Sequence, residues 1–168
     1  TDKTAGIGCG SKPEFDCMVP ERRREVTTEG GVDVAGQQDK VSAGVKQLSE
    51  ASILVTMFID ADQRRIEAAV ASREPYIEIH TGAYADTAEG LARDAELARI
   101  ASAATFAASR GLKVNAGHGL TYHNVQPIAA LPEMHELNIG HATIGRALFS
   151  GLAAAVSDLK ALMREARR

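Results

Sequence analysis

The sequence predicts an α/β fold in which parallel strands alternate with helices. Apolar runs rich in β-branched residues indicate strands at 15–19, 53–59, 76–79, 113–115 and 136–139. These runs are too continuously apolar for half-exposed strands. Helical segments are predicted at about 33–50, 62–72, 86–110, 124–131 and 143–167. Such regular alternation predicts one parallel sheet with right-handed crossovers.

The ends of the predicted elements carry their own signals. Asp62 is placed as a helix N-cap, and Gly111 as the glycine that ends the long helix. Residues 1–11 are expected to be a frayed end, because three glycines would each cost a helix about 1 kcal/mol. No linker or low-complexity tract is visible, so 1–168 is predicted to be a single domain.

Composition excludes several classes of protein. A chain of 168 residues with 45% hydrophobic residues and a formal net charge of −3 suits one soluble domain. Scattered basic residues and only 4% aromatic residues argue against a nucleic-acid partner. No apolar run approaches the ~20 residues of a membrane span, and no signal peptide is visible. Cys9 and Cys17 lack metal-ligand spacing and suggest reduced thiols, so we expect a cytoplasmic protein without a metal site.

Polar residues gather where the predicted strands end. Two strand ends have nearly the same sequence, VNAGHG at 114–119 and LNIGHA at 137–142. A strand that stops at a glycine and exposes backbone N–H groups at the start of a helix is typical of phosphate binding in α/β barrels. We therefore predict phosphate-binding loops at about 117–120 and 140–143. The strand with the sequence YIEIHTG at 76–82 ends in a related way, which places three histidines at one end of three neighbouring strands.

These histidines have different expected roles. His118 stands between two glycines, where the backbone can approach a ligand closely, and this favours catalysis over packing. Gly140 and His141 are predicted to bind phosphate.

Glu78 is a possible substrate-contacting carboxylate, and we expect only one of Glu78 and His80 to face the sheet interior directly. The other histidines, His80, His123 and His135, are expected to be ordinary packed or surface residues, whereas Asp60 is a candidate for the site and Asp62 only a cap.

The loop at about 21–31 is long and charged and ends in two glycines. This composition is typical of a lid that closes over an anionic substrate. A solvated connector would have the same composition, and both interpretations stay open.

Several motifs together resemble one enzyme family. They are VPE at 19–21, TTEGGVDVAGQ at 27–37, FID at 58–60, IEIHTG at 77–82, VNAGHGLTY at 114–122 and ELNIGHATIGR at 136–146. From about residue 12 to the C-terminus the chain resembles pyridoxine 5′-phosphate synthases. The resemblance implies a (β/α)₈ TIM barrel that condenses 1-deoxy-D-xylulose 5-phosphate with 3-amino-2-oxopropyl phosphate. The products are pyridoxine 5′-phosphate, phosphate and water.

The resemblance also implies residue roles and partners. His118 matches the proton-donating histidine. Gly119, Gly140 and His141 match the residues that hold the aminoketone phosphate, and Thr27 matches the lid threonine that meets the sugar phosphate. No metal and no organic cofactor is implied. The family's partners are small phosphorylated substrates, inorganic phosphate and further copies of itself, as dimers that pack into a homo-octamer.

The chain departs from this family in two connectors and in its extent. At 51–52 and 73–74 it has no glycine where one ordinarily ends the preceding helix, which costs about 1 kcal/mol each, so either these loops have rearranged or the stability is lower. Only about five of the eight βα units are present, and the histidine and glutamate that act as proton acceptors have no match. We therefore expect the chain alone to be inactive. One alternative is a non-catalytic phosphate-binding or assembly module derived from the barrel. A different phosphate-handling barrel enzyme, such as an aldolase or epimerase, is disfavoured because Lys113 begins a strand, away from the site end.

Overall fold

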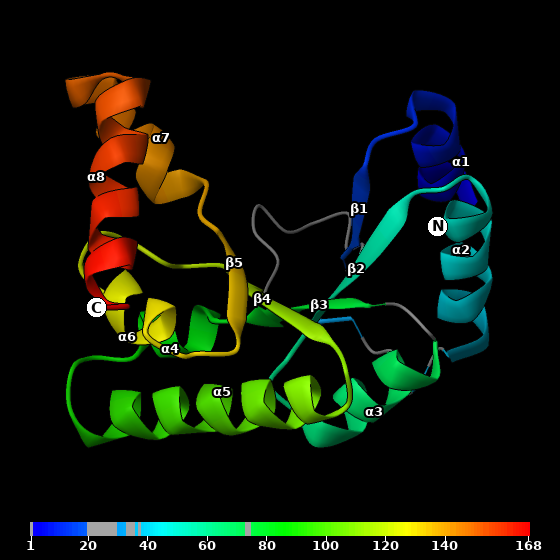
Figure 1. Cartoon of the computed structure of the whole chain (residues 1–168), viewed down its shortest axis with the longest axis horizontal. Coiled ribbons are helices and arrows are strands. Elements are labelled where there is room, and N and C mark those ends of the chain that lie inside the picture. The colour runs from blue at the N-terminus through cyan, green and yellow to red at the C-terminus, as the bar shows by residue number, and fades with distance from the viewer. Residues whose placement is uncertain (1, 20–29, 33–35, 37, 73–74) are drawn as a thin grey trace.

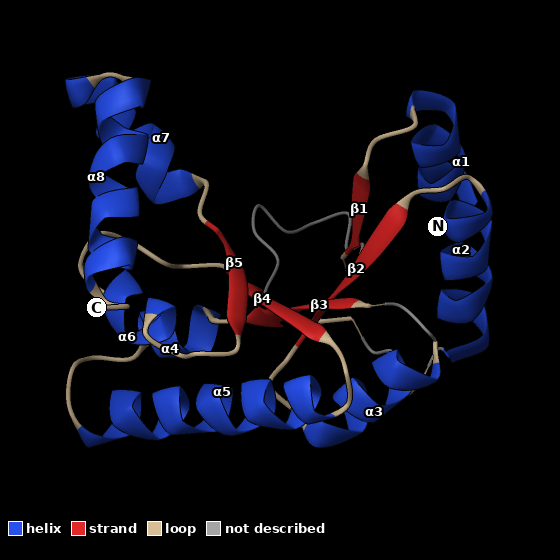
Figure 2. Cartoon of the chain, viewed as in Figure 1, coloured by secondary structure: helices blue, strands red, loops and turns tan. Residues whose placement is uncertain are grey.

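A computed structural model describes residues 2–19, 30–32, 36, 38–72 and 75–168 (Figure 1). Five strands form one parallel sheet in chain order: β1 (Phe15–Met18), β2 (Leu54–Ile59), β3 (Tyr76–His80), β4 (Lys113–Gly117) and β5 (Met134–Asn138). The helices lie along the outside of the curved sheet (Figure 2). A sheet in chain order with helices on its outer face is an arc of a (β/α) barrel. The α/β fold with about five βα units is confirmed.

Eight helices are described. They are α1 (Asp2–Ser11), α2 (Gln38–Glu50), α3 (Gln63–Ala71), α4 (Gly82–Asp86), α5 (Leu91–Ser109), α6 (Val125–Ala129), α7 (His141–Ser150) and α8 (Leu152–Glu165). Among the described residues, no helix is long and apolar enough to cross a membrane.

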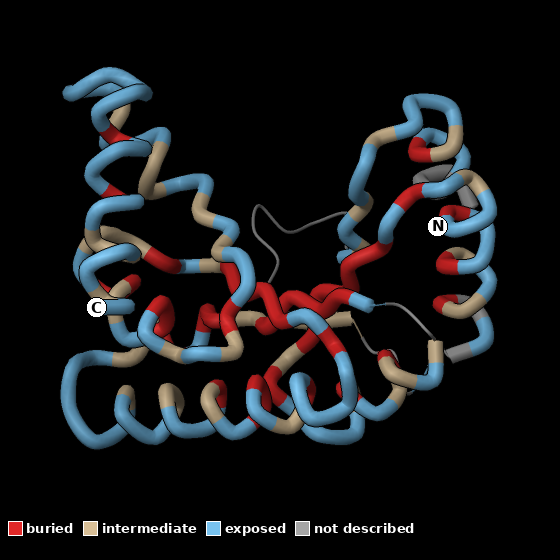
Figure 3. Tube along the Cα trace, in the orientation of Figure 1, coloured by how far each residue is buried: buried red, intermediate tan, exposed pale blue. Residues whose placement is uncertain are grey.

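Side-chain alternation along the strands divides the sheet into two faces. On the outer face, residues such as Met57, Ile77, Ile79 and Val114 join the apolar core under the helices. Figure 3 shows burial concentrated along the strands and on the helix turns that face them. The alternate residues form the inner face, which consists of Thr56, Phe58, Tyr76, Glu78, His80, Asn115 and Gly117. The inner face is polar, and it therefore carries the candidate site.

Two predicted helices differ from the structure. The segment predicted at 143–167 is divided into α7 and α8, separated by Gly151 at φ 80° and ψ 153°. The segment predicted at 86–110 is α5, which begins only at Leu91, after Gly90 at φ 129°, and the short α4 before it was not predicted. Both glycines have a positive φ that glycine adopts at little cost, and the hydrophobic pattern of the sequence does not mark either position.

The expectation of a frayed end at residues 1–11 is wrong, because Asp2–Ser11 form α1. Gly8 is buried, and a Cβ there would lie 2.9 Å from Asp16 Oδ2 and 3.0 Å from Leu48 Cδ2. The absence of a side chain thus lets α1 pack closely on β1 and α2. Tertiary packing offsets the weak helix propensity of glycine here.

Helix ends follow the predicted signals. Asp62 is the N-cap of α3 and accepts hydrogen bonds from the backbone N–H groups of Arg64 and Arg65 at 3.0 and 3.1 Å. Gly111 ends α5 at φ 86°, where Gly111 N donates to Ala108 O and Leu112 N to Ala107 O. These two bonds define a Schellman motif.

The connector at 51–52 uses the same motif without a glycine. Ser52 N donates to Ser49 O at 2.9 Å, and Ile53 N donates to Leu48 O at 3.1 Å. Ser52 therefore stands at φ 63° in the left-handed region. Ser52 thus occupies, under strain, the left-handed position that a glycine adopts without strain. The second such connector, 73–74, lies outside the described residues.

Candidate active site

Three rings from neighbouring strand ends meet on the inner face. His80 ends β3, His118 follows β4, and Phe58 lies near the end of β2. The ring centroid of His80 lies 5.0 Å from that of His118 and 5.1 Å from that of Phe58, both in edge-to-face geometry. Phe58 and His118 are 6.0 Å apart. The carboxyl ends of parallel strands meet at one edge of the sheet, which is why three sequence-distant rings form one cluster.

The turn that carries His118 has an unusual backbone. His118 has φ 83° and Gly119 has φ 75°. A left-handed φ is uncommon for a non-glycine residue and costs of the order of 1–3 kcal/mol. At Gly119 a Cβ would lie only 2.6 Å from the Cβ of Ala85. The glycine allows the turn to approach α4, and His118 is strained by its place on that turn.

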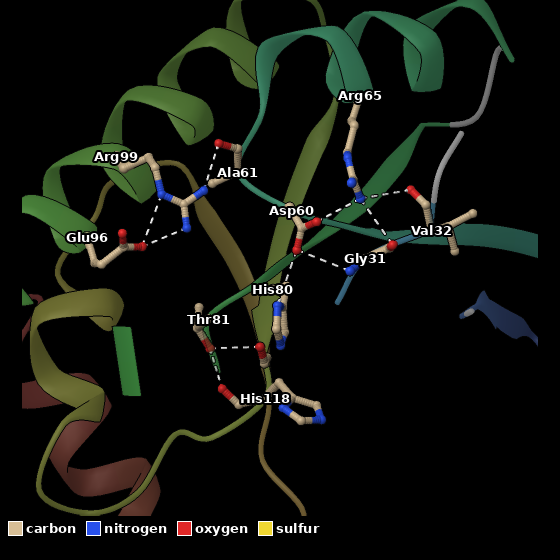
Figure 4. Close-up of polar contacts among 11 residues, drawn as sticks. Gly31, Val32, Asp60, Ala61, Arg65, His80, Thr81, Glu96, Arg99 and His118 are labelled. Atoms are coloured by element: carbon tan, nitrogen blue, oxygen red, sulfur yellow. Dashed lines mark hydrogen bonds and ion pairs between the residues drawn. The ribbon is translucent and has the colours of Figure 1, made fainter. Parts of the chain in front are cut away.

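Thr81 holds this turn in place (Figure 4). Its side chain is fully buried, and its hydroxyl lies 2.7 Å from both Gly117 O and His118 O. The backbone N–H of Thr81 also donates to Gly117 O at 2.8 Å. Sequence reasoning did not single out Thr81. The available signal was its place directly after His80 in the strand-ending motif IHTG.

The environment of His118 disfavours its charged form. Burial, and after it the electrostatic effect of His80, lowers the pKa of His118 below its ordinary value. The carboxylate of Asp86 works in the opposite direction, and His141 adds to the lowering. Without a bound anion His118 is therefore neutral at neutral pH and can accept a proton as well as donate one.

Glu78 lies on the same inner face as His80, so the expectation that only one of them faces the interior is wrong. Residues two apart on a strand share a face. Glu78 is buried and accepts a hydrogen bond from Asn138 Nδ2 at 2.8 Å, and the Cys17 thiol lies 3.8 Å from its carboxylate. Burial raises the pKa of Glu78. A Cβ at Gly117 would lie 2.2 Å from Glu78 Oε1, so Gly117 makes room for this carboxylate.

Cys17 belongs to the edge strand β1, yet its thiol is turned toward Glu78. Cys17 as a whole residue is exposed, but protein atoms around its sulfur remove water from the thiol. This desolvation, and after it the charge of Glu78, raises the pKa of Cys17 to about 12. The thiol thus stays protonated at neutral pH. Both cysteines are free.

Asp60 reaches the site from the end of β2. Its Oδ1 accepts a hydrogen bond from Gly31 N at 3.1 Å and lies 3.3 Å from His80 Nδ1, and its Oδ2 lies 2.7 Å from Arg65 Nη1. The bond to His80 is the main reason why the pKa of Asp60 is lowered to about 2. A Cβ at Gly31 would lie 2.3 Å from Asp60 N, so only glycine fits there.

The second predicted phosphate loop leads into α7. Gly140 is the N-cap residue of α7 and has no side-chain cap. His141 is exposed, and Thr143 Oγ1 donates to Ile139 O at 2.7 Å. A Cβ at Gly140 would meet nothing within 4 Å. The space beside Gly140 is therefore open at the start of α7, and α7 follows β5, the strand next to β4.

Several predicted residues lie elsewhere. Thr27 and most of the loop at 21–31 lie outside the described residues; within the loop the structure describes Gly30 and Gly31. His123 and His135 are exposed, and His135 lies 6.0 Å from the Tyr76 ring. In the described part of the chain, no three His, Cys, Asp or Glu side chains gather as metal ligands.

Comparison with known proteins identifies the family. A model of the pyridoxal phosphate biosynthesis protein PdxJ matches residues 1–165. The chain belongs to this family. The resemblance drawn from the motifs is thus confirmed, and the PdxJ match extends through α1 rather than beginning near residue 12. A pyridoxine 5′-phosphate synthase from Photobacterium profundum is 58% identical over 168 residues, which are 100% of this chain and 69% of the relative. The PdxJ family is a family of enzymes.

Proposed function

We propose that the chain carries the proton-donating and phosphate-binding part of a pyridoxine 5′-phosphate synthase. The reaction joins 1-deoxy-D-xylulose 5-phosphate to 3-amino-2-oxopropyl phosphate and yields pyridoxine 5′-phosphate, phosphate and water. The observation that carries the proposal is the strained turn of His118 between two glycines, held by Thr81 at the ends of the strands. Strain of this kind is retained where a side chain must be presented to a ligand.

His118 is the proposed proton donor. Imine formation, dehydration and ring closure are proton transfers around bound phosphates, so a general acid accelerates them. Burial keeps free His118 neutral, and the charge of an arriving phosphate favours its protonated form. His118 would then take up its proton only after a phosphorylated substrate has bound. Glu78, whose pKa is raised by burial, is the proposed carboxyl contact to the reacting substrate.

The proposed phosphate site combines two loops. Gly119 offers a backbone N–H in the turn after β4, and Gly140 and His141 offer the N-terminus of α7 after β5. Helix N-termini favour phosphate through their free N–H groups and the helix dipole. We assign the aminoketone phosphate to this site. Thr27 is proposed to bind the sugar phosphate.

We further propose that the chain is inactive by itself. Within the described residues β1 and β5 are the edge strands of the five-stranded sheet, and no residue of the chain matches the family's proton-accepting histidine and glutamate. The family resemblance also supports a cytoplasmic homo-octamer. The chain spans 69% of the Photobacterium profundum relative, which is the observation that keeps a non-catalytic phosphate-binding module as the second candidate.

The deciding experiment adds the part of the relative that the match does not cover. The purified chain is incubated with both phosphorylated substrates, alone and together with that remaining segment of the relative, and the product is followed by mass. We expect product only from the mixture. His118→Ala in the mixture should lower turnover by ~10²-fold or more, as for loss of a general acid. The control His123→Ala removes an exposed histidine and should leave turnover unchanged.

Four results would each overturn a part of the proposal. Product from the chain alone would refute the inactivity, and normal turnover of His118→Ala would refute the acid. A mixture that binds inorganic phosphate but forms no product would favour the non-catalytic module. Binding that His141→Ala does not weaken would remove the assigned phosphate site.

A further inference from the structure

One carboxylate connects three parts of the molecule beside the candidate acid. Asp60 Oδ1 accepts a hydrogen bond from the backbone N–H of Gly31 and faces His80 Nδ1, while Oδ2 pairs with Arg65 (Figure 4). The His80 bond is the leading cause that holds the pKa of Asp60 at about 2, so this group is a carboxylate at all ordinary pH values. A carboxylate only accepts hydrogen bonds. The proton must therefore be on Nδ1 of His80, and its tautomer is determined.

His80 is fixed on its other sides as well. Its side chain is only 10% exposed, and its ring packs edge-to-face against both His118 and Phe58. Nε2 of His80 is buried and has no hydrogen-bond partner within the described part of the chain. Gly82 leaves room for this nitrogen, because a Cβ there would lie 2.6 Å from it. Burying the His80 ring with an unsatisfied Nε2 lowers the stability of the fold, and a buried polar atom without a partner indicates a role beyond packing.

We propose that Asp60 and His80 are positioning residues for His118: Asp60 fixes the orientation and tautomer of the His80 ring, and that ring sets the place and protonation of His118. The proposal rests on the proposed function, in which His118 donates the proton. The family resemblance assigned no role to either Asp60 or His80.

Within the described residues, charged and titratable groups lie around the pair on several elements. Arg65 on α3 lies against Asp60, and Glu78 on β3 lies on the inner face beside His80. Asp86 at the end of α4 raises the pKa of His118, and His141 at the start of α7 lowers it. His80 is the nearest ring among them, at 5.0 Å from His118. Its removal should therefore shift the titration of His118 upward.

The test observes the histidines directly in the full chain by nitrogen-15 NMR, with His118 assigned through His118→Gln. In the unsubstituted protein we expect the Nδ1 signal of His80 at the position of a protonated nitrogen. Asp60→Asn should move it toward the average of exchanging tautomers. His80→Gln should raise the pKa of His118. Circular dichroism checks that each variant is folded.

Two matched controls separate positioning from general structure. Asp62→Asn makes the same chemical change two residues away and keeps a good N-cap residue. Arg65→Gln removes the ion pair of Asp60 but leaves its contact with His80. Neither should change the His80 signal. A His80 tautomer unaffected by Asp60→Asn, or changed equally by Arg65→Gln, would overturn the proposal, and so would a His118 titration unaffected by His80→Gln.

A kinetic readout complements the NMR. In the mixture that restores turnover, Asp60→Asn should lower kcat by about 10- to 100-fold while KM stays nearly constant, because a displaced acid impairs the chemical step rather than binding. A raised KM with normal kcat would contradict positioning. Absence of product from the unsubstituted mixture contradicts the proposed function alone, since the NMR measurement does not depend on turnover.

Discussion

Replacing Thr81 by valine should release the turn that presents His118. The Thr81 hydroxyl lies 2.7 Å from Gly117 O and His118 O. Gly117 O keeps the backbone bond from Thr81 N, whereas His118 O loses its partner within the described residues. A lost hydrogen bond costs about 0.5–1.5 kcal/mol, and an orphaned buried carbonyl about 1–3 kcal/mol. Relaxation of the left-handed φ of His118 returns part of this, so we expect a loss of about 2 kcal/mol.

Urea unfolding followed by far-ultraviolet circular dichroism measures this loss. Thr87→Val is the matched control, because the Thr87 hydroxyl bonds Ala83 O at an exposed helix end and its removal should cost less than about 0.5 kcal/mol. Thr81→Ser keeps the hydroxyl and should retain most of the stability. Equal losses for Thr81→Val and Thr87→Val would refute the reasoning. So would a Thr81→Ser variant as unstable as the valine variant.

Three further predictions concern other positions. Ser52→Gly should raise the free energy of unfolding by about 1 kcal/mol, because glycine adopts the left-handed φ of this position without strain. Gly111→Ala, at the equivalent position of the second Schellman motif, should lower it by about 1 kcal/mol. Changes of the opposite sign in urea unfolding would contradict both assignments. Gly31→Ala should destabilise the chain strongly, since its Cβ would overlap the backbone at Asp60, whereas Gly30→Ala meets nothing; equal midpoints would show that this approach is not real. The pKa of Asp60 is lowered from 3.8 to about 2, so its contribution to the free energy of unfolding is full above pH 4 and is lost as the pH falls toward 2. Asp60→Asn should therefore lose about 1–2 kcal/mol less stability than the unsubstituted chain over this pH range, and identical pH profiles of stability would contradict the stabilising role of the Asp60 carboxylate.

The order and direction of the strands could be predicted from the sequence, because continuous apolar runs such as 53–59 have few alternatives. The break at Gly151 and the start of α5 after Gly90 could not, since the hydrophobic pattern does not mark them and the φ of each glycine decides. In the N-terminal helix the deciding factor was Gly8, whose effect depends on contacts with Asp16 and Leu48 that form only in the folded chain.

For the candidate site, His118 and the two phosphate-binding loops could be predicted from the sequence, but Thr81 and His80, which contact His118 or its turn, could not. The role of Thr81 depends on two carbonyl groups of a turn 36 and 37 residues away, and backbone carbonyls leave no mark in a sequence. His80 was expected to be an ordinary histidine because its neighbours come from other strands. The register of Glu78 opposite Asn115 and of His80 opposite Gly117 decides which side chains meet, and register follows from the assembled sheet.

That same register groups the inner-face side chains into rows that cross adjacent strands. Phe58, Glu78 and Asn115 form one row, and His80, Gly117 and Asn138 form the next. At the edge strands β1 and β5 of the described sheet, Phe15 is 44% exposed, and Asn138, which donates to Glu78, is exposed. In a closed eight-stranded barrel, side chains fill the interior and cover such rows. Burial sets the pKa values of Glu78 and His118, so closure of the barrel would also strengthen the shifts on which the proposed proton transfers depend.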